Sequence, residues 1–521
     1  MKFNRSSGII LHPTSLPGPD GIGDLGPEAY RWVNFLKESG VGLWQVLPLG
    51  PTGYGDSPYQ AFSAFAGNPY LVSPTLLLDD DLLTAEDLID RPDFPTDHVE
   101  FGEVIQWKLT LLDRAFTNFK KSATDEMKLE LTQFLATEAS WLDDFALFMA
   151  IKESQGGVSW ENWPKPLRSR DAKALQAFRE QNPEAIQRHM FRQFLFFRQW
   201  QKLHDYTKEQ GIIILGDIPI FVAYDSADAW SHPELFYMDS EGKPTFVAGV
   251  PPDYFSPTGQ LWGNPIYKWD AHHETGYAWW IERIRQTLKL FDVLRIDHFR
   301  GFAGYWEIPA GMPTAEVGRW APGPGVALFE AIRAALGGLP IIAEDLGEIT
   351  PDVIELRETL GLPGMKILQF AFQNDPADPF LPHNYPRNCV AYTGTHDNDT
   401  TVGWYTSVPE PERDLARRYL ARSGNDIAWD FIRAVWSSVA MYALAPMQDL
   451  LALDTSGRMN LPGRPGGNWT WRVDPDMLTE ALAARMRETN FLYSRLLGEE
   501  NPVDPSRGIK VSPKAKDMVK E

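Results

Sequence analysis

The feature that most constrains this chain is a repeated alternation of short apolar runs with longer amphipathic stretches. This alternation is typical of parallel strands joined by crossover helices. Eight runs fit the strand pattern, namely residues 8–12, 44–48, 211–217, 293–297, 339–344, 365–370, 389–392 and 447–453. The helical stretches between them include residues 27–40, with Pro27 in the first turn and Gly40 at the end, and residues 426–444. The pattern predicts an α/β protein with a (β/α)8 TIM barrel, and a doubly wound sheet is the alternative.

Two long segments interrupt the alternation and predict insertions. Residues 74–204 have helical spacing, which predicts a mainly helical insertion between strands 2 and 3. Residues 222–278 are rich in proline, glycine and aromatic residues and are predicted to form a loop-rich insertion. The barrel would then comprise residues 1–73 and 205–501, followed by a polar, lysine-rich tail at 502–521.

Composition excludes several classes of partner. The net charge of −21 argues against nucleic acid and anionic membranes, both of which select for basic surfaces. The 19 tryptophans suit a large core and also the stacking of aromatic rings on sugars. A single cysteine, Cys389, rules out an internal disulfide and fits a reducing compartment. The apolar run near the N-terminus is too short for a secretory signal, and we therefore expect a cytoplasmic protein.

Acidic residues follow the ends of several predicted strands. Asp297 ends the fourth strand, and Arg295 lies two residues earlier on the same face, where it would keep the carboxylate ionised. Glu344 ends the fifth strand, Asp397 follows the seventh, and Asp217 ends the third. Because strand ends converge on one rim of a barrel, we expect these acids to share a pocket.

Crowded carboxylates repel one another, so one of them should hold its proton at neutral pH. One ionised and one protonated carboxyl group are what glycosidic bond cleavage requires, as nucleophile and as proton donor. A third acid could stabilise positive charge on the sugar ring. His298 and His396 could donate hydrogen bonds to hydroxyls, or could simply pack at the rim. A metal site is disfavoured because Arg295 and Arg300 would repel a cation, and no serine-hydrolase elbow or phosphate loop is present in the sequence.

Several motifs together resemble the amylomaltase family, the 4-α-glucanotransferases also called disproportionating enzymes. They run in order over residues 7–472, as GIILHPTSLP (8–17), QVLPLGPTGYGDSPY (45–59), GDIPIFV (216–222), DSAD (225–228), GVPPDYF (249–255), GQLWGNP (259–265), RIDHFRG (295–301), AEDLG (343–347), THDND (395–399) and NWTWR (468–472).

The resemblance implies a retaining mechanism on linear α-1,4-glucans and malto-oligosaccharides, with no metal or organic cofactor. It implies that Asp297 is the nucleophile, Glu344 the acid/base and Asp397 the transition-state stabiliser. The residues implied or expected to contact the sugar are Tyr59, Asp217, Tyr254, Phe255, Gln260, Trp262, Arg295, His298, His396 and Asn468. Asp217 could instead orient Arg295 through an ion pair, and Tyr59 could be a turn residue that fills the rim.

A transferase must favour a sugar hydroxyl over water. We expect the loop of residues 249–262 to act as an aromatic lid, with Tyr254, Phe255 and Trp262 stacking on acceptor sugars. The alternative is that these rings only pack the loop onto the barrel. Two other functions stay open at this stage. An α-glucan hydrolase would use the same acids, and a non-catalytic glucan-binding protein could retain the fold. The sequence does not indicate an oligomeric state.

Overall fold

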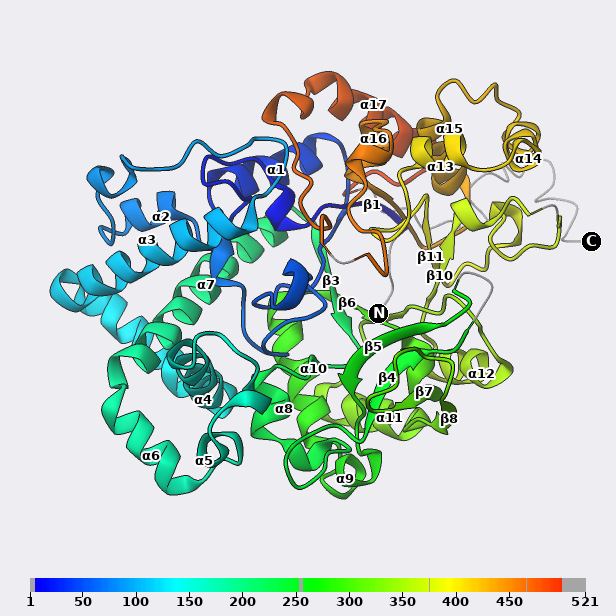
Figure 1. Ribbon diagram of the computed structural model, residues 1–521. Helices are drawn as coiled ribbons and strands as arrows, with labels where there is room; N and C mark the ends of the chain where they lie inside the picture. The colour runs from blue at the N-terminus through cyan, green and yellow to red at the C-terminus, as the bar shows by residue number, and fades with distance from the viewer. Residues whose placement is uncertain (1–4, 253–255, 374, 465, 499–521) are drawn as a thin grey trace, which may run out of the picture.

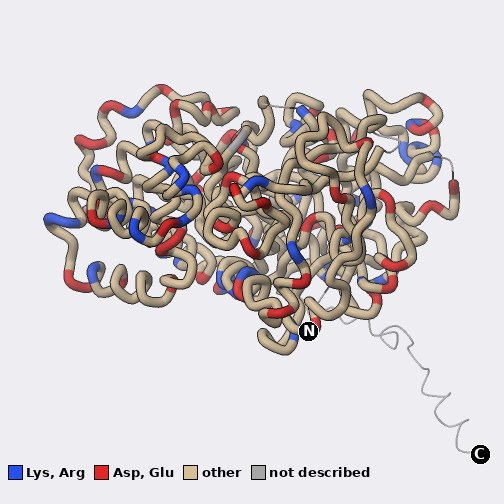
Figure 2. Tube along the Cα trace, turned by 60° about the horizontal axis from the view of Figure 1, so that its bottom comes forward, with Lys and Arg blue, Asp and Glu red and all other residues tan. Residues whose placement is uncertain are grey.

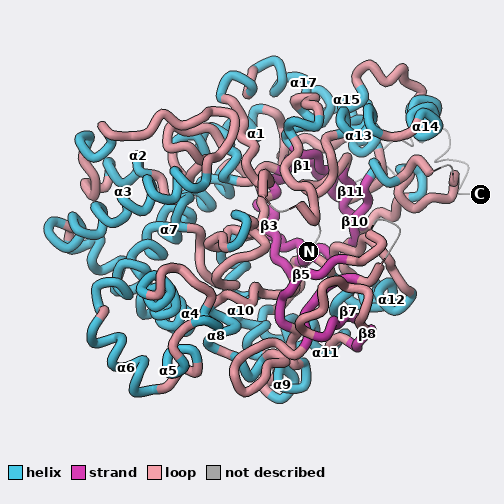
Figure 3. The backbone as a smooth tube through the Cα atoms, in the orientation of Figure 1, coloured by secondary structure: helices cyan, strands magenta, loops and turns pink. Residues whose placement is uncertain are grey.

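The centre of the molecule is a parallel barrel. The computed structural model describes residues 5–252, 256–373, 375–464 and 466–498. Within them, eight parallel strands follow the order β10-β11-β12-β1-β2-β3-β6-β9, and Figures 1 and 3 show helices surrounding these strands. The backbone N–H of Ala343 in β9 donates to the carbonyl of Pro363, next to β10, at 2.9 Å. The two sheet edges therefore meet, and the predicted TIM barrel is confirmed.

The barrel strands are short, and helices connect most of them. The strands are β1 (Ser6–Ile10), β2 (Leu43–Gln45), β3 (Ile213–Pro219), β6 (Val293–Asp297), β9 (Ile341–Ala343), β10 (Gly364–Ile367), β11 (Cys389–Tyr392) and β12 (Tyr442–Pro446). The helices beside them are α1 (Pro27–Glu38), α7 (Pro183–Glu209), α10 (Ala278–Leu290), α11 (Gly325–Leu336), α12 (Pro351–Leu360), α13 (Thr401–Ser407), α14 (Glu410–Leu420), α15 (Ile427–Ser437) and α17 (Glu480–Leu492).

Large apolar side chains fill the barrel interior and leave little space at Gly8. Leu43 and Leu444 lie on the strands either side of Gly8 in β1 and belong to the interior cluster. A Cβ atom on Gly8 would lie 2.8 Å from the Leu43 Cβ and 2.9 Å from the Leu444 Cγ. Glycine is therefore required at this position by the close approach of its neighbours.

The prediction for the last strand was wrong. Residues 447–453 do not form the eighth strand, because Met447–Leu450 is a short helix, α16. The strand is β12, which we had included in a helix extending to residue 444. The segment Tyr442–Pro446 is rich in alanine and leucine, which favour helices in isolation. Pairing with β1 and β11 overrides that local preference.

Helices occupy most of the chain between β2 and β3. They are α2 (Pro74–Asp79), α3 (Phe101–Ser122), α4 (Asp125–Ser154), α5 (Lys165–Arg168), α6 (Ala172–Gln181) and α7, and Figure 1 shows them on the left of the barrel. Aromatic side chains on α7 belong to the core, since Phe191, Phe194 and Trp200 are each at most 3% exposed. Treating residues 74–204 as a separate subdomain stays a prediction.

The insertion between β3 and β6 is more regular than predicted. It contains the short helices α8 (Ala227–Ser231) and α9 (Trp269–Glu274). It also contributes β4 (Phe246–Val250) and β5 (Gln260–Pro265) to a second sheet. That sheet is antiparallel, in the order β5-β4-β7-β8, and is completed by β7 (Gly304–Pro309) and β8 (Arg319–Pro322). Its strands were missed because their proline and glycine content resembles that of loops.

Charged residues of both signs are spread over the helices and loops (Figure 2). Among the described residues, no helix has the length and apolar character needed to cross a membrane.

A buried ion pair joins α3 to the loop after β1. The Lys108 ammonium donates to Asp24 Oδ2 and to the Val72 carbonyl, both at 3.0 Å. The Lys108 side chain is 1% exposed and the Asp24 side chain 11%. Such a pair holds the helical segment against the barrel, because either charge alone would be buried without compensation.

We therefore predict that Lys108→Met lowers the free energy of unfolding by about 3 kcal/mol. Adding Asp24→Asn should restore most of the loss, because the uncompensated carboxylate is then removed. Lys120→Met is the matched control, since the Lys120 side chain is 41% exposed in its pair with Glu184. Urea unfolding followed by tryptophan fluorescence measures all four proteins. Equal midpoints for Lys108→Met and Lys120→Met would contradict the anchoring role.

Candidate active site

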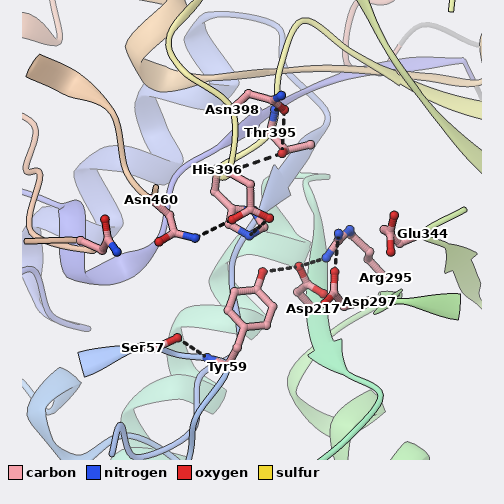
Figure 4. A network of polar contacts seen from close by, with 12 residues as sticks. Ser57, Tyr59, Asp217, Arg295, Asp297, Glu344, Thr395, His396, Asn398 and Asn460 are labelled. Carbon is pink, nitrogen blue, oxygen red and sulfur yellow. Dashed lines mark hydrogen bonds and ion pairs between the residues drawn. The ribbon is translucent and has the colours of Figure 1, made fainter. Parts of the chain in front are cut away.

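Four acidic residues gather at the carboxyl rim of the barrel. Asp217, Asp297 and Glu344 come from β3, β6 and the end of β9, which are neighbours in the sheet. Asp397 comes from the loop after β11. Figure 4 shows its neighbour His396 next to the Tyr59 ring. The predicted convergence of the strand ends is confirmed, although the catalytic roles of these residues stay predictions.

The Arg295 guanidinium bridges two of the acids. Its Nη1 donates to Asp217 Oδ2 at 2.5 Å, and its Nη2 donates to Asp297 Oδ1 at 2.7 Å. The alternation of strand side chains explains the second contact, since both residues face the barrel axis from β6. Burial lowers the pKa of Arg295, but the charges of Asp217 and Asp297 outweigh it and raise the pKa well above its ordinary value. The arginine therefore stays charged and forms an ion pair with Asp297.

Asp217 is completely buried beneath this bridge. Its Oδ2 also accepts a hydrogen bond from the Tyr59 hydroxyl at 2.9 Å. Burial raises the pKa of Asp217 to about 7 against the effect of Arg295, with a further upward contribution from Asp297. Its Oδ1 has no hydrogen-bond partner within the described part of the chain. The ion pair with Arg295, one of our two interpretations of Asp217, is present.

Glu344 lies in a different environment from Asp297. It is 9% exposed, and its two oxygens accept hydrogen bonds from the backbone N–H groups of His298 at 2.7 Å and Leu346 at 2.9 Å. Burial, and then the negative charge of Asp297, raise the pKa of Glu344 to about 8, although Arg295 and the two N–H groups act in the opposite direction. Glu344 therefore carries a proton at neutral pH.

His298 links Asp297 to Glu344 through an unusual backbone conformation. Its φ angle of 54° is in the left-handed region, which is uncommon for a residue other than glycine. Its own N–H group is the one that donates to Glu344. Burial, and then Arg300, lower the pKa of His298 to about 3. The imidazole is therefore neutral, and the Trp262 ring packs edge-on against it at 4.8 Å between centroids.

A second cluster surrounds Asp397. Its Oδ2 lies 3.4 Å from His396 Nε2, and its Oδ1 accepts a hydrogen bond from the Asn460 amide at 2.6 Å. Tyr59 stacks on the His396 ring with centroids 5.2 Å apart, which connects this cluster to Asp217 (Figure 4). Burial lowers the pKa of His396, so its imidazole is neutral at physiological pH.

The other residues that were predicted to contact the sugar lie in different environments. The Trp262 indole N–H donates to the Gln260 side-chain oxygen at 3.1 Å, and the Trp262 ring itself contacts His298. The Asn468 side chain hydrogen-bonds with Leu461 and Arg464 in its own loop. Tyr254 and Phe255 lie outside the described residues. These contacts therefore stay predictions.

Sequence reasoning missed three residues of this site. Asn460 and Arg458 both contact Asp397, although neither belongs to a motif that the sequence analysis used.

His12 follows β1, and its Nδ1 accepts a hydrogen bond from the Leu47 N–H at 3.3 Å, which places the imidazole proton on Nε2. Burial, and then the neighbouring His396, lower the pKa of His12 to about 3. His12 lay within a quoted motif and could have been found there.

Within the described residues, no cluster of three or more histidine, cysteine, aspartate or glutamate side chains is arranged to hold a metal ion.

Comparisons of this sequence with known proteins agree with one another on a single family. A family profile described as 4-alpha-glucanotransferase matches residues 11–479. The chain is 52% identical to a 4-alpha-glucanotransferase from Thermus thermophilus over 504 residues, which cover 95% of this chain and 100% of that protein. It is 48% identical to a 4-alpha-glucanotransferase from Synechocystis over 499 residues, or 95% of this chain and 99% of that protein.

A solved structure supports the same relationship. The amylomaltase from Streptococcus agalactiae in complex with acarbose matches with a TM-score of 0.92 and 42% identity, covering 94% of this chain and 99% of that one. The chain belongs to the 4-alpha-glucanotransferase family.

Proposed function

We propose that this chain transfers a segment of a 1,4-α-D-glucan to the 4-hydroxyl of a glucan or glucose acceptor by a retaining double displacement. The observation that carries the mechanism is the difference between two neighbouring acids. Asp297 is paired with Arg295, whereas burial and repulsion raise the pKa of Glu344 to about 8. A retaining enzyme needs such a pair, with one ionised nucleophile and one protonated acid.

In the first step, Asp297 attacks the anomeric carbon of the donor sugar. Arg295 holds Oδ1, and we assign the second carboxylate oxygen to the new bond. The Asp297 side chain is 32% exposed, which is consistent with access to substrate. As the bond to the departing glucan breaks, Glu344 gives its proton to the leaving oxygen and becomes a carboxylate.

In the second step, the acceptor reverses this proton transfer. Glu344, now ionised, takes the proton from the 4-hydroxyl of the acceptor, whose oxygen attacks the anomeric carbon and displaces Asp297. Two inversions give net retention, and Glu344 is protonated again. Both protons therefore pass through the same carboxyl group, and no metal or organic cofactor is required.

Polar atoms around the nucleophile are suited to hold the donor sugar. Asp217 Oδ1 and His396 Nδ1 are buried and have no partner among the described residues. Buried polar atoms normally form hydrogen bonds, and sugar hydroxyls could provide them. We therefore assign Asp217, His396 and Tyr59 to the donor sugar, and Asp397 to stabilising its transition state. Linear α-1,4-glucans and malto-oligosaccharides are the proposed substrates.

Incubation with maltotriose tests the function directly. We predict glucose together with chains longer than maltotriose, because the glycosyl-enzyme passes its sugar to another sugar. Asp297→Asn should lower the rate by at least about 1,000-fold, since the amide cannot form the intermediate. Asp143→Asn, at an exposed position on α4, is the matched control. Products shorter than maltotriose alone would instead indicate a hydrolase, and no turnover a binding protein.

The raised pKa of Glu344 predicts an alkaline limit to activity. Because the proton is required for leaving-group departure, kcat/KM should fall about tenfold per pH unit above a pH of about 8. With α-maltosyl fluoride as donor, the wild type should lose this limb, because fluoride departs without a proton, and Glu344→Gln should then show the same flat profile above pH 8. Glu330→Gln, at an exposed position on α11, should behave like the wild type. An unchanged alkaline limb in Glu344→Gln would exclude Glu344 as its origin.

The proposed aromatic lid of residues 249–262 can be tested at Trp262, which lies within the described part of the chain. Its ring packs against His298 beside the proposed acceptor site. If the loop excludes water, Trp262→Ala should raise the ratio of hydrolysis to transfer severalfold, measured as free reducing ends against elongated products. Trp320→Ala, on β8 and 42% exposed, is the control. A ratio equal to that of the wild type would leave Trp262 with a packing role only.

A further inference from the structure

The segment Arg458–Asn460 holds the Asp397 loop through several hydrogen bonds. The Arg458 Nη2 donates to the Asp397 carbonyl at 2.6 Å, and its Nε donates to the Asn460 carbonyl at 2.8 Å. The Asn460 backbone N–H donates to the His396 carbonyl at 3.1 Å. The main chain on both sides of the His396–Asp397 peptide is therefore tied to a loop more than 60 residues further along the chain.

The Asn460 side chain completes this arrangement at the carboxylate itself. Its Nδ2 donates to Asp397 Oδ1 at 2.6 Å, and Figure 4 shows it reaching toward the catalytic cluster from its own loop. Hydrogen bonds to charged acceptors are short and strong, and this one has the corresponding length. This hydrogen bond occupies Oδ1 of the Asp397 carboxylate. The other oxygen, Oδ2, lies near His396 and is left for the sugar.

Exposure distinguishes the roles of the two residues. The Asp397 side chain is 43% exposed, whereas Asn460 is only 9% exposed. Asn460 is thus placed behind Asp397 rather than beside the substrate. A neutral amide also suits the position, because a cation there would offset the negative charge that Asp397 offers to a developing oxocarbenium ion.

We propose that Asn460 is a positioning residue for the transferase reaction, acting through Asp397. Its amide fixes the rotation of the carboxylate so that the oxygen near His396 meets the donor sugar in the transition state. This proposal rests on the proposed function, since it takes Asp397 as the transition-state stabiliser. It goes further because Asn460 belongs to no motif that suggested the activity.

The closest alternative is a purely structural role, in which Asn460 only fastens two loops together. That role predicts loss of folded protein or a rise in KM as the site loosens. A positioning role instead predicts loss of kcat with little change in KM, because the interaction matters most in the transition state. It also predicts that the loss depends on the carboxylate of Asp397.

Steady-state kinetics with α-maltosyl fluoride as donor and maltose as acceptor separate these roles. We expect Asn460→Ala to lower kcat about 10- to 100-fold and to leave KM within about twofold. Asn460→Ser preserves a short donor and provides a second variant if the alanine protein does not fold. Asn118→Ala is the matched control, because the Asn118 amide caps the Leu82 carbonyl in the helical segment.

A double-mutant cycle with Asp397→Asn gives the decisive readout. If Asn460 acts through the carboxylate, Asn460→Ala should have almost no further effect on kcat in the Asp397→Asn background. A full additional loss in that background would overturn the proposal, as would a kcat for Asn460→Ala within about threefold of the wild type. Absence of transfer by the wild-type enzyme would instead refute the proposed function, which keeps the two failures distinct.

Discussion

The Arg295 guanidinium is the contact on which the rest of the site depends. It joins Asp217 to Asp297 from within the barrel wall, with distances of 2.5 and 2.7 Å. Without that cation, acids from three neighbouring strands would face each other with no compensating charge, and their repulsion would oppose both folding and ionisation. With it, Asp297 has a cation as direct partner, whereas Glu344 accepts hydrogen bonds from two backbone N–H groups and keeps its proton. A single arginine thus creates the asymmetry between the proposed nucleophile and the proposed acid.

The fold supplies this asymmetry through position rather than through unusual residues. Adjacent parallel strands place Asp217, Asp297 and Glu344 side by side, and burial raises the pKa of Asp217 and Glu344. The loops after β2 and β11 then add Asp397, held by Asn460, and the stacked pair of Tyr59 and His396. The neutral histidines and buried amides contribute hydrogen bonds without further charge. The site can therefore concentrate negative charge where positive charge develops on the sugar.

Sequence reasoning recovered the parts of this arrangement that follow from local pattern. The acids could be found because they follow the ends of predicted strands, and the alternation of side chains along a strand placed Arg295 on the same face as Asp297. Both features depend only on residues that are close in the sequence. Strand β12 was missed because its alanine-rich segment has helical propensity and becomes a strand only through its neighbours. The antiparallel sheet was missed because the proline and glycine residues of its strands resemble those of loops. Asn460 could not be found at all, since its contact with Asp397 joins two loops and has no periodic signature.

The central claim is that neighbouring acids at one rim hold different protonation states. Infrared difference spectroscopy of the free enzyme, titrated from about pH 6 to pH 9, tests this directly when wild-type spectra are compared with those of Glu344→Gln. The account predicts two protonated-carboxyl bands at pH 6 in the wild type. The band of Asp217 should disappear near pH 7 in both proteins, whereas the band that disappears near pH 8 should be missing from the variant. If wild type and variant showed the same carboxyl bands throughout the titration, Glu344 would already be ionised and the account would be contradicted.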